Sequence, residues 1–135
     1  MVTVQRHEVL VVQTPEDVVL VRQAVRRSAE ELGFGLVDQT KLVTAASELS
    51  RNALIHGGGG TARLEVVENE SRSGLRLTVE DSGPGIPDVE AAMRDGFTTS
   101  GGLGLGLSGS RRLVNEFEID SRVGEGTRVT VVRWK

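Results

Sequence analysis

Apolar residues recur every three or four positions in two long segments, which is the spacing of helices with one buried face. In residues 14–33 the apolar stripe consists of Val18, Val21, Val25, Ala29 and Leu32. Thr14 and Pro15 suit the start of this helix, and Gly33 suits its end. A second helix is predicted from Asp38 to about Ile55, before a run of four glycines, with the stripe Leu42, Ala46, Leu49 and Ala53.

Short apolar or alternating runs predict strands at 7–12, 62–69, 75–81, 117–121 and 127–134. Polar turns between neighbouring runs predict two hairpins, and a short helix near 88–94 and another at 104–115 complete the chain. This order predicts an α+β fold: a two-layer sandwich with helices on one face of a mixed, mostly antiparallel sheet. With 135 residues, we expect one domain spanning 1–135.

Composition narrows the functional classes. A net charge of −3 argues against a general nucleic-acid-binding surface. The absence of cysteine excludes disulfides and thiolate metal sites, and two histidines argue against a histidine-based metal site or triad. Because no apolar run is long enough for a signal peptide or a membrane span, we expect a cytoplasmic protein that does not associate with membranes.

Asp81 breaks the pattern of its strand. Leu75, Leu77, Val79 and Asp81 share one face, because side chains two apart on a strand point the same way. A carboxylate on this apolar face needs hydrogen-bond donors. It either forms an Asx turn with the residues that follow or accepts from the amino group of a ligand, which could approach closely at Gly83 and Gly85.

Glu48 and Asn52 lie four residues apart, on one side of the second helix. They are either part of a solvated polar face or a functional pair. His56 is interpreted as a helix-end residue that favours the helix dipole.

The segment GGLGLGLSGS at 101–110 contains a G-x-G-x-x-G spacing. It is not a Walker A loop, because no Lys-Ser/Thr follows the glycines, and it is not a Rossmann turn, because no strand immediately precedes it. The remaining interpretation is a flexible loop that runs into a helix start at 104–107. Exposed N–H groups there can bind phosphate, while the leucines anchor the segment to the core.

Four motifs together resemble the N, G1, G2 and G3 boxes of the GHKL ATPases: ExxxN at 48–52, DSGPGI at 81–86, GLGLGL at 102–107 and GEGT at 124–127. With their intervening elements they cover about 38–134. In detail, the sequence of residues 81–127 resembles that of the RsbT-type switch kinases of the stressosome, which are related to anti-sigma factor kinases. The chain lacks the dimerisation helices and phospho-accepting histidine region of a histidine kinase. The positions around Ser50 and Arg51 vary, so Arg51 is assigned no role.

The resemblance implies ATP and Mg²⁺ as cofactors. Asp81 would accept from the adenine amino group, Thr127 would reach the base through water, and Glu48 would be the catalytic base. Asn52 would be the Mg²⁺ ligand. The expected nucleotide-binding residues are Asn52, Asp81, Gly83, Gly85, Ile86 and Thr127, together with an ATP lid formed by Gly102, Leu103, Gly104, Leu105, Gly106 and Leu107.

The resemblance also implies a protein serine/threonine kinase of a partner-switching stress module. Its expected substrates are STAS-domain scaffold and antagonist proteins, and when released it would activate a PP2C-type phosphatase. Two alternatives remain: an anti-sigma factor that sequesters a sigma subunit, and a non-catalytic ATP-sensing module. Arg111 and Arg112 either face phosphate or a partner, or lie on a solvated helix face.

Overall fold

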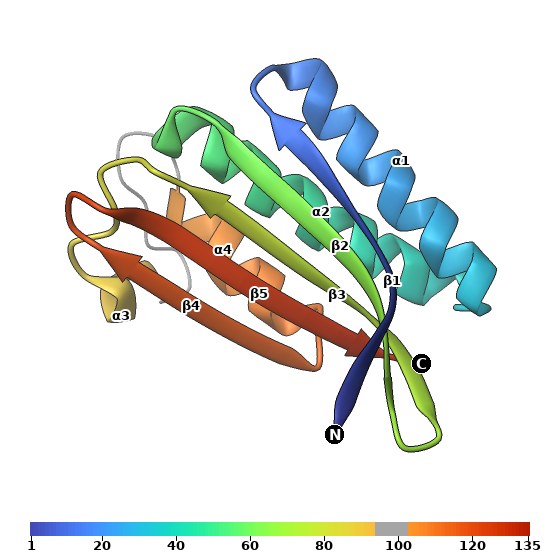
Figure 1. Ribbon diagram of the computed structural model, residues 1–135. Helices are drawn as coiled ribbons and strands as arrows, with labels where there is room; N and C mark the ends of the chain where they lie inside the picture. The colour runs from blue at the N-terminus through green and yellow to red at the C-terminus, as the bar shows by residue number, and fades with distance from the viewer. Residues whose placement is uncertain (94–102) are drawn as a thin grey trace.

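A sheet and a layer of helices make up the fold (Figure 1). The computed structural model describes residues 1–93 and 103–135. The helices are α1 (Pro15–Leu32), α2 (Leu36–Gly57), α3 (Val89–Ala92) and α4 (Leu103–Arg112). The strands are β1 (Val2–Val12), β2 (Gly60–Asn69), β3 (Arg72–Asp81), β4 (Glu116–Arg122) and β5 (Gly126–Trp134). The long helices α1 and α2 and the shorter α4 all cover the same face of the sheet (Figure 1).

The five strands follow the order β1-β2-β3-β5-β4. Both predicted hairpins, β2–β3 and β4–β5, are present. The α+β sandwich is therefore confirmed, and each of the four pairings between the described strands is antiparallel rather than mixed. Strand β1 begins five residues earlier than its apolar run, because pairing with β2 extends back to Val2 opposite Asn69.

The helix ends follow local chemistry. Thr14 and Asp17 form a capping box at the start of α1: the Asp17 N–H donates to Thr14 Oγ1 at 3.2 Å, and the Thr14 N–H donates to the Asp17 carboxylate at 3.1 Å. Gly33 ends α1 in the left-handed conformation, with φ of 85°. Helix α2 begins at Leu36, two residues before the predicted start, and α4 ends at Arg112, three residues before the predicted end.

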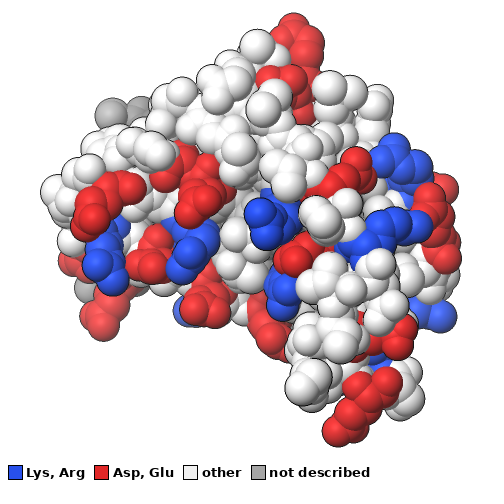
Figure 2. All heavy atoms as spheres, in the orientation of Figure 1, with Lys and Arg blue, Asp and Glu red and all other residues white. Residues whose placement is uncertain are grey.

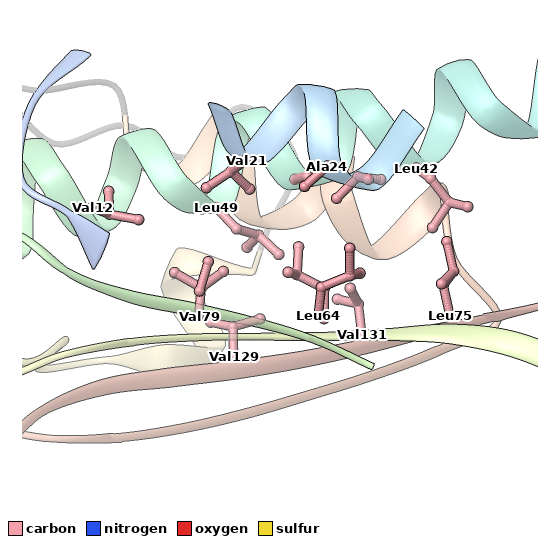
Figure 3. Close-up of a cluster of buried hydrophobic side chains, with 14 of the residues drawn as sticks. Val12, Val21, Ala24, Leu42, Leu49, Leu64, Leu75, Val79, Val129 and Val131 are labelled. Atoms are coloured by element: carbon pink, nitrogen blue, oxygen red, sulfur yellow. The ribbon is translucent and has the colours of Figure 1, made fainter. Parts of the chain in front are cut away.

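The core lies between the helices and the sheet, where Val21 and Leu49 from the helices face Val79 and Leu64 from the strands (Figure 3). Every member of the predicted α2 stripe is buried. In α1 only Leu32 departs from the prediction, because it is partly buried at the margin of the core. Within the described residues, no helix is both long and apolar enough to cross a membrane.

The opposite face of the sheet is not covered by helices and carries side chains of both charges (Figure 2). Arg76 binds Glu65 through two N–H groups, at 2.8 and 3.2 Å. Arg128 contacts Asp120 at 3.3 Å. Alternation along the strands therefore separates a charged face from the apolar face that carries the core.

Leu75 is 1% exposed, so shortening its side chain tests the placement of the core. We expect Leu75→Ala to lower the free energy of unfolding by about 2–5 kcal/mol, because it removes buried contacts and leaves a cavity. The matched control is Val11→Ala on β1, where the side chain is 60% exposed and the change should stay within about 0.5 kcal/mol. Urea unfolding followed by far-UV circular dichroism measures both. Equal losses in the two variants would contradict this placement of the core.

Candidate functional site

A cavity of about 460 Å³ opens where the C-terminal half of α2 meets the end of β3 and the loop that follows it. Apolar side chains of the core, including Leu49 and Val79, form much of its wall, and α3 and α4 each contribute a residue. The predicted residues Asn52, Asp81, Gly85, Ile86, Leu107 and Thr127 all line it. The fold thus brings together side chains that are up to 75 positions apart, from Asn52 to Thr127.

Asp81 forms the predicted Asx turn and also lines the cavity, so its role as an acceptor for a ligand stays a prediction. Its Oδ1 accepts from the Gly83 N–H at 2.9 Å, which is the Asx turn, and its side chain also lines the cavity. Burial raises the pKa of Asp81, while the backbone N–H groups of Gly83 and Thr127 act in the opposite direction. A partly desolvated carboxylate at this position is suited to bind a hydrogen-bond donor.

Two glycines allow the end of α2 to contact this carboxylate. A Cβ placed on Gly57 would collide with the carboxyl group of Asp81. A Cβ placed on Gly83 would lie 2.6 Å from the Gly57 Cα. Gly83 was predicted, but Gly57 was interpreted only as part of the glycine run that ends the helix. A larger residue at either position would push the α2 backbone away from Asp81.

The hydroxyl of Ser121, on β4, joins the loop that follows β3 to the β4–β5 hairpin. Ser121 Oγ accepts from the Ile86 N–H at 2.8 Å and lies 2.8 Å from Thr127 Oγ1. The Gly124 N–H donates to the Pro84 carbonyl at 2.8 Å, and a Cβ on Gly85 would collide with the Arg122 carbonyl. The sequence analysis did not identify Ser121.

One feature of the sequence does point to Ser121. Ser121 follows Phe117 and Ile119 at a spacing of two, as Asp81 follows the apolar positions of β3. In the sheet, Asp81 pairs with Thr127, and Thr127 pairs with Ser121. The three polar side chains therefore form a row across β3, β5 and β4, at the end of the core-facing surface.

Asn52 does not lie on a solvated face, which was the alternative interpretation. Its Nδ2 is buried and has no hydrogen-bond partner within the described residues. The residue as a whole is half-buried and lines the cavity, so other atoms of its side chain are accessible from it. The amide oxygen of Asn52 is an acceptor that can bind a cation, so this residue fits a nucleotide-bound metal ion.

A second cavity, of about 650 Å³, lies between α2 and α4 and contains Glu48. Glu48 Oε1 is 3.9 Å from Arg51 Nη1, so Arg51, which had no predicted role, is the ionic neighbour of the predicted base. Glu48 does not line the first cavity, whereas Asn52 and His56 line both. His56 is in the last turn of α2, as predicted, and Arg112 lines the second cavity.

The predicted lid is described only in part. Gly102 lies outside the described residues. Leu103, Gly104, Leu105 and Gly106 belong to α4, so the helix begins one residue before the predicted position. Leu107 is 2% exposed and lines the first cavity, as expected for a leucine that anchors the segment to the core.

Known proteins share both the sequence and the fold. The chain is 48% identical over 123 residues to the serine/threonine-protein kinase RsbT of Bacillus subtilis (strain 168), covering 91% of this chain and 92% of that protein. It is 32% identical over 115 residues to the anti-sigma F factor of Geobacillus kaustophilus (strain HTA426), covering 80% and 77%. These relatives confirm the predicted resemblance to RsbT-type kinases and to anti-sigma factors.

The crystal structure of the RsbU and RsbW domains of a Mycobacterium tuberculosis protein superposes with a TM-score of 0.67 at 21% identity. The match covers 97% of this chain and 33% of that one, and it supports the fold alone. Residues 37–135 match the family described as histidine kinase-, DNA gyrase B- and HSP90-like ATPases, which is the superfamily predicted from the four motifs. The chain belongs to this ATPase family.

Proposed function

We propose that the chain binds Mg-ATP in the first cavity and transfers the γ-phosphoryl group to a serine or threonine hydroxyl presented in the second. The enzyme class is that of a protein serine/threonine kinase that uses ATP. The observation that carries the proposal is the placement of Asn52. Asn52 lines both an apolar cavity that contains the Asp81 carboxylate and a second cavity that contains Glu48.

The base of the nucleotide fits the first cavity chemically. Adenine offers a flat apolar face and an amino donor, and the cavity offers apolar walls and the Asp81 carboxylate. Thr127, beside Asp81 on β5, would complete the contact with the base through water. Gly83 and Gly85 keep the loop close to the site, and Ile86 adds apolar surface.

Asn52 and the start of α4 would serve the phosphates. Within residues 1–93 and 103–135, no three acidic or histidine side chains group as a metal site. A magnesium ion at Asn52 would therefore be held mostly by phosphate oxygens and water, as is usual for this ion. When bound, it neutralises charge on the phosphates. The N–H groups of the first turn of α4, at Leu103–Gly106, are suited to bind phosphate oxygens.

Glu48 would accept the proton of the attacking hydroxyl. It lies one helical turn before Asn52, so one face of α2 presents the base and the phosphate-binding residue together. Arg51 Nη1 is 3.9 Å from Glu48 Oε1, so a cation lies beside the proposed base. The partner's segment would enter between α2 and α4, where the second cavity opens.

The partners remain part of the proposal. We expect STAS-domain scaffold and antagonist proteins as substrates and a PP2C-type phosphatase as the partner of the released kinase. The similarity to anti-sigma F factors keeps a second candidate function open, in which the chain sequesters a sigma subunit and phosphorylates its antagonist. Incubation with labelled ATP, a STAS-domain protein and a sigma subunit separates the two, because only the second function requires a stable complex with the sigma subunit.

Asp81→Asn should weaken ATP binding at least about tenfold, because an amide replaces the charged acceptor of the adenine amino group. Isothermal titration with ATP measures this, and GTP should bind wild type poorly. The control is Asp120→Asn, a carboxylate paired with Arg128 on the charged face, which should bind ATP normally. Equal ATP binding by folded Asp81→Asn and wild type would remove Asp81 from the adenine site.

The same change should stabilise the nucleotide-free protein near neutral pH. Burial raises the pKa of Asp81, so its ionisation opposes folding above that raised pKa. The opposition fades as the pH falls towards the ordinary aspartate pKa of about 3.9 and is absent below it. Thermal unfolding at several pH values should show Asp81→Asn above wild type at pH 7 and equal to it below pH 4. An advantage that grows on acidification would contradict the assigned cause.

Glu48→Gln should retain Mg-ATP binding but transfer phosphate about 10²–10⁴-fold more slowly, because the amide cannot accept the proton. Asn52→Ala should weaken Mg-ATP binding as well as turnover. Single-turnover transfer from labelled ATP and isothermal titration separate the two effects, with Gln39→Ala on the same helix as the control. Transfer near the wild-type rate in Glu48→Gln would exclude it as the base.

Phosphorylation should release the STAS-domain partner. It adds about 1.5–2 negative charges to a residue that lies beside Glu48, so the phosphorylated partner should bind at least about tenfold more weakly. Surface plasmon resonance with the unmodified partner, the phosphorylated partner and its serine→aspartate variant measures this, after mass spectrometry has confirmed the modification. Equal affinities of the three forms would refute the release step.

A further inference from the structure

The second cavity differs in charge from the chain around it. Apart from His56, its titratable lining residues in the described part of the chain are Glu48 and two arginines, Arg51 on α2 and Arg112 on α4. The chain as a whole carries a net charge of −3, so an excess of arginine here is a local departure from the overall charge. A protein segment that binds beside these side chains is therefore expected to contribute a carboxylate.

Three of the lining residues form a line along one side of α2. Glu48, Arg51 and Ile55 are separated by three and then four residues, and side chains at those separations are neighbours on a helix surface. The side chain of Arg51 is 57% exposed, and Ile55 is 61% exposed. The line therefore presents the proposed base, a cation and an apolar group, in that order, to a segment that enters between α2 and α4.

The contact between Arg51 and Glu48 is long for an ion pair. Arg51 Nη1 lies 3.9 Å from Glu48 Oε1, which is too far for a hydrogen bond, and both side chains are accessible to solvent. An exposed pair of this kind contributes little to stability. Arg51 can therefore turn to a carboxylate on a partner with little loss of stability in the fold.

The spacing on α2 sets where that carboxylate would lie in the partner. Side chains three residues apart on a helix are about 5–6 Å apart at Cβ. An extended segment advances about 3.3 Å per residue, so it covers this distance in about two residues. With the acceptor hydroxyl beside Glu48, an acidic residue one or two positions away would meet Arg51, and an apolar residue beyond it would meet Ile55.

We propose that Arg51 is a specificity-determining residue, which selects an acceptor serine or threonine that has a carboxylate within two positions of it in the partner. The inference rests on the proposed kinase function and names the chemistry of its protein substrate. Arg51 contacts the partner and not the nucleotide, because it lines the second cavity and not the first. The pairing also fits release of the product: Arg51 already holds the partner's carboxylate when the phosphate forms, so this cation does not retain the phosphate beside Glu48.

The experiment uses a STAS-domain substrate in which each position within two residues of the acceptor serine is in turn aspartate, asparagine or lysine. Initial rates of transfer from labelled ATP give kcat and KM for each form. At one of these positions wild type should prefer aspartate to asparagine at least about fivefold in kcat/KM, through KM, and should accept lysine least. In Arg51→Gln the aspartate and asparagine forms should become equivalent, and in Arg51→Glu lysine should be preferred. The KM for ATP should stay at the wild-type value in both variants.

Arg27→Gln and Arg27→Glu are the matched controls. The side chain of Arg27 is also 57% exposed and also pairs with a glutamate, Glu8, but it lies on α1 and lines neither cavity. Both control variants should keep the wild-type order of substrates. The reversed order in Arg51→Glu separates a direct contact from a structural role, because a damaged helix would lower the rates with all three substrate forms together.

Failure of this inference can be distinguished from failure of the proposed function. If wild type phosphorylates the three forms equally at every position, or if Arg51→Glu keeps the wild-type order, the inference is wrong while kinase activity stands. If wild type transfers phosphate to none of the forms, the proposed function and the inference both fail. A raised KM for ATP in Arg51→Gln with an unchanged order of substrates would assign Arg51 to the nucleotide and would also overturn the inference.

Discussion

The contact between the end of α2 and the carboxyl group of Asp81 is the constraint on which the site depends. The helix contributes Asn52 and His56, the sheet contributes Asp81 and Thr127, and at Gly57 the helix backbone contacts the Asp81 side chain directly. A residue with a Cβ at that position would separate the layers where the cavity forms. This close packing fixes the distance between the side chains of the helix and those of the sheet before any ligand binds.

The cavity is a continuation of the core whose wall becomes polar at one end. Val79 and Val129 belong to the buried cluster and also line the cavity, and Asp81 and Thr127 follow the same alternation along their strands. The carboxylate lies at the edge of the apolar layer, which raises its pKa and leaves it on the wall of the cavity, so one position explains both its desolvation and the role proposed for it.

The helices and strands could be predicted from the sequence because the apolar periodicity and the capping residues indicate the same element bounds. Helix α1 has both its capping box and its terminal glycine, and all the predicted α2 core positions are buried. The start of β1 could not be predicted, because pairing with distant β2, and not an apolar run, makes it a strand. Asp81 was singled out because it breaks the pattern of its strand, and Asn52 because of its spacing from Glu48 and the resemblance to the ATPase motifs. Ser121 and Gly57 were not singled out, and their contacts exist only once the chain has folded.

Asn52 and His56 line both cavities, and this sharing has a thermodynamic consequence. Two ligands that contact the same side chains cannot bind independently unless those side chains are indifferent to both. If a ligand in the first cavity changes the affinity of the second cavity by some factor, a ligand in the second cavity must change the affinity of the first by the same factor. Under the proposed function, a partner that enters between α2 and α4 would therefore also change the affinity for nucleotide, and different partners would set that affinity to different values through the same two residues.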